Sequence, residues 1–298
     1  MLFVSFAAVF PARADMGGIY PAEAVVSETS QKAIILHNLE EEVLILETDL
    51  QADRKTGLIR FIPFPSEPEV ALAPEDAFQV ASNLIREHGL VFMYQTKGGG
   101  EAEGQAVELL QHKKLGAHDL TVIKINDLSH FRSWVNDFFR SKGLPTRKSY
   151  AEVETVAGDY LKRGIAYFVF DFVELTGETR SIEPVAYKFK STDLYYPLIT
   201  SNTFGGEGDI NLILFAHHTP CDSLYSYYEG ALDLSAWRCS TWSQVLVDEL
   251  RPIYPEAGTF FKDLNVYVQM YSYWGAYKFD QDLIFDISVN IPPGVKKE

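Results

Sequence analysis

The chain has 298 residues, of which 47% are hydrophobic and 22% are charged, so its composition is globular rather than disordered. Its formal net charge of -15 disfavours nucleic acid and anionic membrane surfaces as partners unless a basic cluster exists, and no basic run is longer than two residues, as at Arg147-Lys148. After the N-terminal segment, no apolar run is long enough for a membrane-spanning helix.

Residues 1–14, MLFVSFAAVFPARA, have the pattern of a secretory signal peptide. An apolar run ends at Pro11, and Ala12-Arg13-Ala14 is a small-x-small cleavage site. The usual basic n-region is missing, and the alternative is a buried N-terminal strand. We expect cleavage between Ala14 and Asp15 and a secreted or periplasmic mature chain without a transmembrane segment.

Residues 23–62 contain four strand-like runs and predict a β-meander. The next stretch, RFIPFPSEPEV, carries Pro63, Pro65, Ser66 and Pro68. Its PxxP spacing is that of a ligand for a partner groove. Prolines also hold the chain extended and end strand pairing, so we favour a stiff crossover from a strand to a helix.

Four helices follow from periodicity and end signals. The first begins near Pro74 and ends at Gly89, with Ala77, Ala81, Leu84 and Ile85 on one face. Capping and periodicity predict the others, which are a helix from Asp127 or Ser129 to Gly143, a helix from the Ser149–Glu152 capping box to Gly164, and a helix near Ser240 to Leu250 capped by Thr241 and Gln244.

Strand-like runs outnumber these helices and do not alternate strictly with them. They include IAYFVFDFVEL, IEPVAYKFK, DINLILFAHH and LNVYVQMYSYW. The fold class is therefore α+β, with a mainly antiparallel β-sheet and about four α-helices packed on it. We divide the chain into the signal remnant (1–14), an α+β domain (15–220) and a C-terminal α+β extension (221–298) packed on the same sheet.

Several of these stretches occur together, in order, in a known group. QKAIILHNLEEEVLILETDL, FIPFPSEPEV, LGAHDLTVIKIND, FRSWVNDFFRSKG and YLKRGIAYFVFDFVEL resemble secreted bacterial and archaeal proteins of the domain of unknown function 2330. The likeness runs from about Asp15 to about His217 and is weak beyond Pro220. It implies export and one architecture. The family has no established activity, so no catalytic residue is carried over.

Three residues are candidates for acid–base catalysis. Asp171 lies between apolar residues in a strand, where burial without partners raises a carboxyl pKa, although a salt bridge is the usual outcome. His118 begins a strand beside Asp119, but neighbours in a strand point to opposite faces. His130 is the third candidate, and a cavity joining these side chains indicates an enzyme.

Metal binding has weaker support. HHTPC groups His217, His218 and Cys221, but no second ligand cluster appears, and export favours a disulfide between Cys221 and Cys239 over two free thiols. Alternate aspartates in FDQDLIFD (Asp280, Asp282 and Asp286) lack the EF-hand pattern, so a solvated turn is favoured. Glu40 to Glu42 read as a charged hairpin tip. We therefore expect no cofactor and no metal.

The function expected from the sequence is binding. The local motifs of phosphate-binding, dinucleotide-binding and common hydrolase sites are absent. Aromatic runs SLYSYYEG and VYVQMYSYWGAY supply either a contact surface or core. We expect a non-catalytic, exported protein that binds a protein or carbohydrate, or is a subunit of the cell envelope. The alternative is an extracytoplasmic hydrolase with dispersed carboxylates and histidines.

Overall fold

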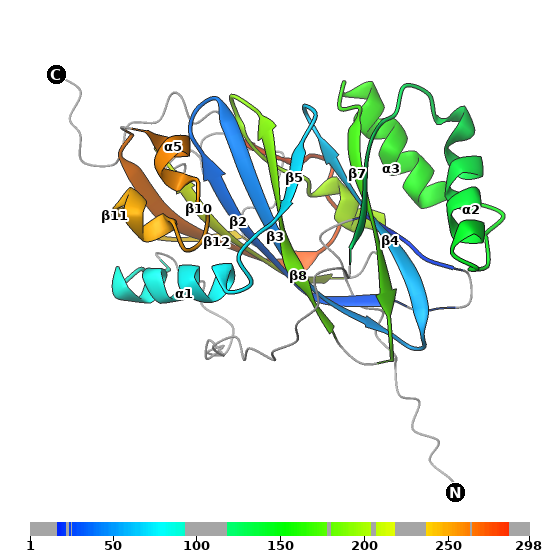
Figure 1. The fold of residues 1–298 in the computed structure, drawn as a ribbon, viewed down its shortest axis with the longest axis horizontal. Helices are drawn as coiled ribbons and strands as arrows, with labels where there is room; N and C mark the ends of the chain where they lie inside the picture. Colours follow the sequence, from blue (N-terminus) through cyan, green and yellow to red (C-terminus); the bar gives the residue numbers. More distant parts are fainter. Residues whose placement is uncertain are drawn as a thin grey trace, which may run out of the picture.

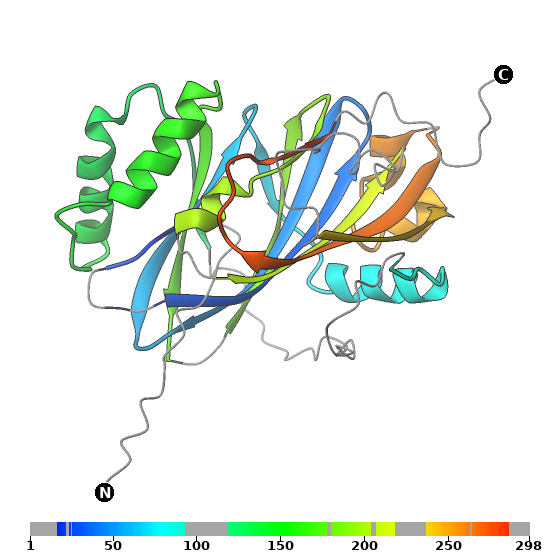
Figure 2. The same cartoon turned by 180° about the vertical axis from the view of Figure 1, so that it is seen from behind.

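Two stacked β-sheets organise the chain in the computed structural model, with helices at either end of the stack (Figure 1; Figure 2 shows the reverse view). The structure describes residues 17–21, 24, 26–92, 118–177, 180–203, 207–217, 237–262 and 264–285. The predicted signal peptide, His218 and Cys221 lie outside these residues.

The larger sheet has seven strands in the spatial order β11, β12, β10, β2, β3, β8 and β5. In that order, the strands span Trp237–Val245, Val266–Ala276, Glu207–Ala216, Val26–His37, Glu41–Ala52, Arg180–Lys190 and Glu69–Leu72. Within this sheet β10 and β2 run parallel, whereas the other neighbouring strands are antiparallel.

The smaller sheets are antiparallel. The four-stranded sheet has the order β1, β4, β7 and β6, whose bounds are Gly17–Ile19, Thr56–Phe64, Tyr167–Leu175 and Asp119–Lys124. A two-stranded sheet pairs β9 (Leu194–Tyr196) with β13 (Leu283–Phe285). Aromatic contacts such as Tyr271–Phe285, at 6.4 Å between ring centroids, pack this small sheet against β12 of the larger one.

Helices cover the outer faces of the two sheets. The α-helices are α1 (Ala77–Glu87), α2 (Phe131–Ser141), α3 (Ala151–Lys162) and α5 (Ala257–Phe261), and the 3-10 turns are η1 (Leu128–His130), η2 (Ile199–Thr203) and η4 (Val247–Leu250). One core cluster joins α1 and α5 to the larger sheet, while α2 lies on the four-stranded sheet, with Trp134 4.7 Å from Phe170 between ring centroids. Figure 1 shows α1 and α5 on one side of the two stacked sheets and α2 and α3 on the other side.

The first three predicted helices form, but the capping box predicted at Ser149–Glu152 is wrong, because the N-cap of α3 is Tyr150 and no side chain caps it. In α1 the predicted face, Ala77, Ala81, Leu84 and Ile85, is buried against the larger sheet. Gly89 follows the helix with a φ of +65°, a conformation that glycine adopts without strain. The Asp127 cap is also present, because its side chain accepts a hydrogen bond from the Ser129 N–H.

The fourth predicted helix, near Ser240 to Leu250, is wrong. Most of this stretch is strand β11, and only its end turns into η4. Thr241 does not cap a helix, because its N–H donates to the Val91 carbonyl at 2.6 Å and its hydroxyl accepts from the Val91 N–H at 3.0 Å. The side chain that supports η4 is Glu249, which accepts from the Leu246 N–H at 2.6 Å.

The predicted meander over residues 23–62 is only partly present. Strands β2 and β3 form an antiparallel hairpin, but β4 leaves it and enters the four-stranded sheet. Pro63 lies within β4, opposite Phe168 of β7. The segment from Pro65 to Pro68 then connects β4 to β5 and crosses from one sheet to the other. The predicted crossover from a strand to a helix is therefore wrong in its end point, because strand β5 lies between this segment and α1.

The α+β fold class with a mainly antiparallel sheet is confirmed. The strands β11 and β12, from the C-terminal part of the chain, lie in the same sheet as β2 and β3. Across the described residues, every helix is too short or too polar to cross a membrane.

Candidate functional site

The candidate site is a buried ion-pair cluster between the two stacked sheets. Arg60 of β4 and Asp171 of β7 are directly opposite in the strand register, so their side chains point to the same face. The Arg60 Nε atom donates to Asp171 Oδ2 at 3.1 Å, and Nη2 donates to the same oxygen. The Asp171 side chain is fully buried, and only 4% of the Arg60 side chain is exposed.

His118 completes this cluster from the residue before β6. Its Nδ1 lies 2.7 Å from Asp171 Oδ2, and its Nε2 lies 3.1 Å from the carbonyl oxygen of Glu183 in β8. Each ring nitrogen of His118 thus lies within hydrogen-bond distance of an oxygen atom, one from each sheet. His118 therefore links the four-stranded sheet to the larger sheet.

The carboxylate of Asp171 is paired within the cluster. The Arg60 guanidinium and the His118 imidazole both contact it, and the carboxylate of Glu183 lies 3.9 Å from His118 Nε2. Burial alone would raise the pKa of Asp171, but the Arg60 charge and the His118 contacts outweigh it and hold the pKa below its usual value. Asp171 is therefore an ionised, paired carboxylate, which is the salt-bridge alternative rather than a carboxyl of raised pKa.

The other predicted site residues do not join this cluster. His130 is exposed in η1, at the start of α2. His217 Nδ1 lies 3.0 Å from the Asn265 carbonyl oxygen, and His218 lies outside the described residues. In the part of the chain that the structure describes, no group of three or more His, Cys, Asp or Glu side chains has an arrangement that could hold a metal ion.

Cys239 is buried and disulfide-bonded. Cys221, the other cysteine of the chain, lies outside the described residues, so the pairing of Cys221 with Cys239 stays a prediction.

The aromatic run on β12 belongs mostly to the core, since Tyr271 and Tyr273 are buried. Trp274 is the exception, with 56% of its surface exposed. The run SLYSYYEG lies outside the described residues.

The structure contains a second buried polar cluster that the sequence patterns did not predict. Asp282, which precedes β13, is 3% exposed, and its Oδ1 accepts from the Tyr160 hydroxyl at 2.8 Å and from the Ile199 N–H at 3.0 Å. Burial outweighs these hydrogen bonds and raises the pKa of Asp282 to about 6. The prediction of a solvated turn at Asp282 is therefore wrong.

Glu42 is buried in the same region and is not part of a solvated hairpin tip. Its Oε2 accepts from the Tyr195 N–H at 2.7 Å, while its Oε1 has no hydrogen-bond partner among the described residues. Burial raises the pKa of Glu42 well above its usual value, because the hydrogen bond does not offset the loss of water. Glu40, at the same hairpin, is exposed as predicted.

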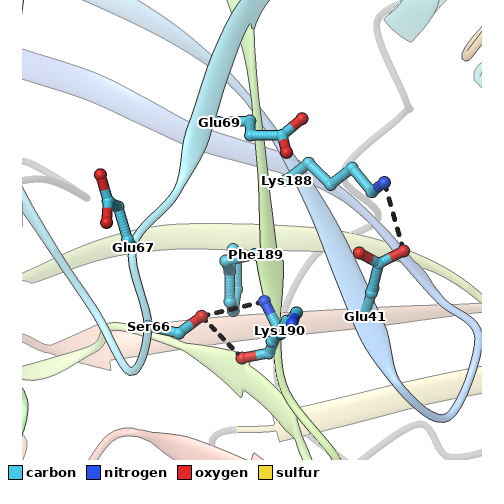
Figure 3. A pocket seen from close by; sticks show the side chains of 7 residues that line it. All are labelled: Glu41, Ser66, Glu67, Glu69, Lys188, Phe189 and Lys190. Atoms are coloured by element: carbon cyan, nitrogen blue, oxygen red, sulfur yellow. Dashed lines mark hydrogen bonds and ion pairs between the residues drawn. The ribbon is translucent and has the colours of Figure 1, made fainter.

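The proline segment forms one wall of a small cavity of about 240 Å³ (Figure 3). Its lining residues are Glu41, Ser66, Glu67, Glu69, Lys188, Phe189 and Lys190. Lys188 Nζ pairs with Glu41 at 3.2 Å, and the Ser66 hydroxyl donates to the Lys190 carbonyl and accepts from the Lys190 N–H, each at 2.9 Å. Both hydrogen bonds of the Ser66 hydroxyl are thus made to the backbone of Lys190.

Comparison with known proteins gives no family assignment. No family model and no curated protein matches the chain. Among solved structures, the crystal structure of baculovirus P35 matches with a TM-score of 0.44 and 8% identity, over 89% of this chain and 98% of that chain. A mutated baculovirus P35 after caspase cleavage matches with a TM-score of 0.40 and 8% identity, over 88% of this chain and 99% of that chain. These TM-scores are too low to carry an argument about function.

Proposed function

We propose that the chain is an exported, non-catalytic protein that acts by binding a partner at the cell envelope. The main support is the state of the Arg60–Asp171–His118 cluster. The Asp171 carboxylate and the His118 imidazole are buried and in contact with each other, and Arg60 pairs with the carboxylate, so they hold two sheets together rather than meet a substrate. The ordered motifs that resemble the domain of unknown function 2330 support export and membership of that group.

The alternative, a hydrolase, draws on the 2.7 Å contact between His118 and Asp171. A general base must reach the proton that it removes from the substrate or from an attacking water. Only 4% of the His118 side chain is exposed, and the Asp171 side chain is fully buried. The cavity in Figure 3 has other lining residues, so it does not bring a substrate to this pair.

The export proposal gains support from the position of the first strand. Strand β1 begins at Gly17, directly after the predicted cleavage between Ala14 and Asp15, and its residues are buried against β4. A mature chain that starts at Asp15 therefore keeps all of β1. The mass of the protein recovered from the periplasm or the medium tests this, and a chain that retains residues 1–14 there would contradict the cleavage site.

The non-catalytic proposal is tested by turnover. The purified mature chain is incubated with chromogenic esters, phosphates, glycosides and peptides between about pH 5 and pH 8, the range in which histidine and perturbed carboxyl groups act. We expect no saturable turnover. Turnover that co-purifies with the folded chain and is lost in both Asp171→Asn and His118→Gln would establish the hydrolase instead.

The binding half of the proposal has its own assay. A fluorescently labelled mature chain is sedimented in an envelope extract, where a bound partner increases its sedimentation rate. An excess of unlabelled chain should reverse the increase, because a specific site saturates. A labelled chain that sediments identically in buffer and in extract would contradict the binding proposal.

A further inference from the structure

The outer strands of the two larger sheets differ in how their free edges are protected. Proteins usually guard such edges by short length, charge, proline or a covering segment, since unpaired backbone groups recruit other strands. Strand β5 is four residues long, follows Pro68 and begins with Glu69. Strand β11 is covered in its middle, where Thr241 bonds to Val91 and Ser240 forms a bridge with Phe92. Strand β1 is short and buried.

Strand β6 is the exception. It pairs with β7 along its whole length, and none of the described strands pairs with its other edge. Its charged residues, Asp119 and Lys124, are confined to the two ends. The middle of the strand, Leu-Thr-Val-Ile, is uncharged and only partly covered, and Val122 is 39% exposed.

The register shows which backbone groups of β6 are free to pair. Just beyond the strand, the Ile125 N–H donates to the Ala166 carbonyl at 2.8 Å, on the β7 side. Backbone groups along a strand point alternately to its two sides. The N–H groups of Thr121 and Ile123 therefore face β7, whereas the N–H and C=O groups of Leu120, Val122 and Lys124 face outward.

We propose that this outer edge of β6 binds an extended, basic polypeptide segment, which adds to the four-stranded sheet as a further strand. The inference rests on the proposed binding function and names the partner class. A second copy of the chain is disfavoured because both copies carry a formal charge of -15, whereas a segment with lysine or arginine is attracted to that charge.

Side-chain placement defines the rest of the segment. Leu120 and Val122 share the face of Asp171, which looks toward the larger sheet, while Thr121 and Ile123 share the face covered by α2. An added strand places its own side chains alternately beside these two rows. A segment of alternating β-branched residues between lysines fits both rows and the overall charge.

The first test is amide hydrogen exchange with a defined probe, the synthetic peptide Lys-Val-Thr-Val-Thr-Val-Lys. In the free chain, the outward amides of Val122 and Lys124 should exchange faster than the inward amides of Thr121 and Ile123. Peptide addition should slow the outward amides by about tenfold or more, because each gains a ladder hydrogen bond. Strong protection of the outward amides without peptide would overturn the proposal, since the edge would already be occupied.

A matched pair of variants isolates the backbone contribution. Val122→Pro removes an outward N–H and leaves the bonds between β6 and β7 in place, so it should abolish peptide protection in a chain that still folds. Val122→Thr keeps the N–H and a β-branched shape, so it should bind as the wild type does. Peptide binding that survives Val122→Pro would place the site elsewhere and overturn the proposal.

Two further measurements distinguish other occupants. A peptide in which glutamates replace the lysines should bind at least about tenfold more weakly, and equal binding would contradict the basic partner class. Sedimentation of the chain alone should show a monomer. A dimer that Val122→Pro dissociates would make a second copy the occupant. The turnover assays do not involve β6, so failure of this inference and failure of the non-catalytic proposal give different results.

Discussion

Asp282 offers a direct test of how burial controls the charge of this protein. Burial raises its pKa from 3.8 to about 6, against the opposing effects of hydrogen bonds from Ile199 and Tyr160 and the charge of Arg163. The native state therefore binds the Asp282 proton more tightly than the unfolded chain does. Replacing Asp282 by asparagine removes this titration but keeps the carbonyl oxygen Oδ1, on which both hydrogen bonds end.

The sign and size follow from linkage. Well below pH 3.8 Asp282 is protonated in both states, and native stability carries no ionisation penalty. As the pH rises toward about 6, the unfolded chain releases the proton and the native state keeps it, so the stability falls. Above that pH the penalty levels off at about 3 kcal/mol, since one pKa unit corresponds to about 1.4 kcal/mol.

Urea unfolding, followed by circular dichroism, measures this difference. At about pH 7.5 the Asp282→Asn variant should be more stable than the wild type by up to about 3 kcal/mol, and the two should converge near pH 4. Asp280→Asn, at the exposed neighbouring aspartate, is the matched control and should follow the wild type. A difference between Asp282→Asn and wild type that is constant from pH 4 to pH 7.5 would refute the assigned titration.

Three other predictions concern stability. Asp171→Ala should cost about 3–5 kcal/mol because it leaves Arg60 buried without its carboxylate, whereas Asp53→Ala at an exposed ion pair should cost less than about 1 kcal/mol; equal losses in urea unfolding would contradict a structural role for the cluster. Burial lowers the pKa of His37 from 6.5 to about 4, so its contribution to stability is fully present above pH 6.5 and is lost as the pH falls through about 4; an NMR midpoint near 6.5 would contradict its burial. Reduction of the Cys239 disulfide should lower the free energy of unfolding by about 2–4 kcal/mol, and an unchanged urea midpoint after reduction would argue against a stabilising bond.

Local patterns predicted the fold best where the periodicity of apolar residues within one element is enough to identify it as a helix or a strand. The apolar face of α1 and the alternation of Val185, Tyr187 and Phe189 in β8 are visible without tertiary information, and the structure buries these side chains. The helix prediction near Ser240 failed because the Ser, Thr and Gln residues of this stretch suit either a helix cap or a strand. Tertiary hydrogen bonds favour the strand here: the Thr241 N–H donates to the Val91 carbonyl, and the Met270 N–H donates to the Ser240 hydroxyl.

The candidate site could be predicted only in part, for the same reason. Asp171 was noticeable as an acid in an apolar strand, but its partner Arg60 is 111 positions away and becomes its neighbour only through the register of β4 and β7. Glu42 and Asp282 lie among other acidic residues in the sequence, which suggested solvated turns. Their burial depends on Tyr195 and Tyr160, which come from distant elements.

The parallel pairing of β10 with β2 affects the order in which the chain folds. Ile210 lies opposite Gln31, so the two strands meet across most of the sequence, and the contact closes a very long loop. Until the chain beyond Glu207 has been synthesised, the side of β2 that receives β10 has no native partner, and β12 and β11 cannot be added outside it. Such non-local pairings slow folding. For a chain that we propose to be exported, the late closure of the larger sheet keeps the polypeptide incompletely folded until its last third is available.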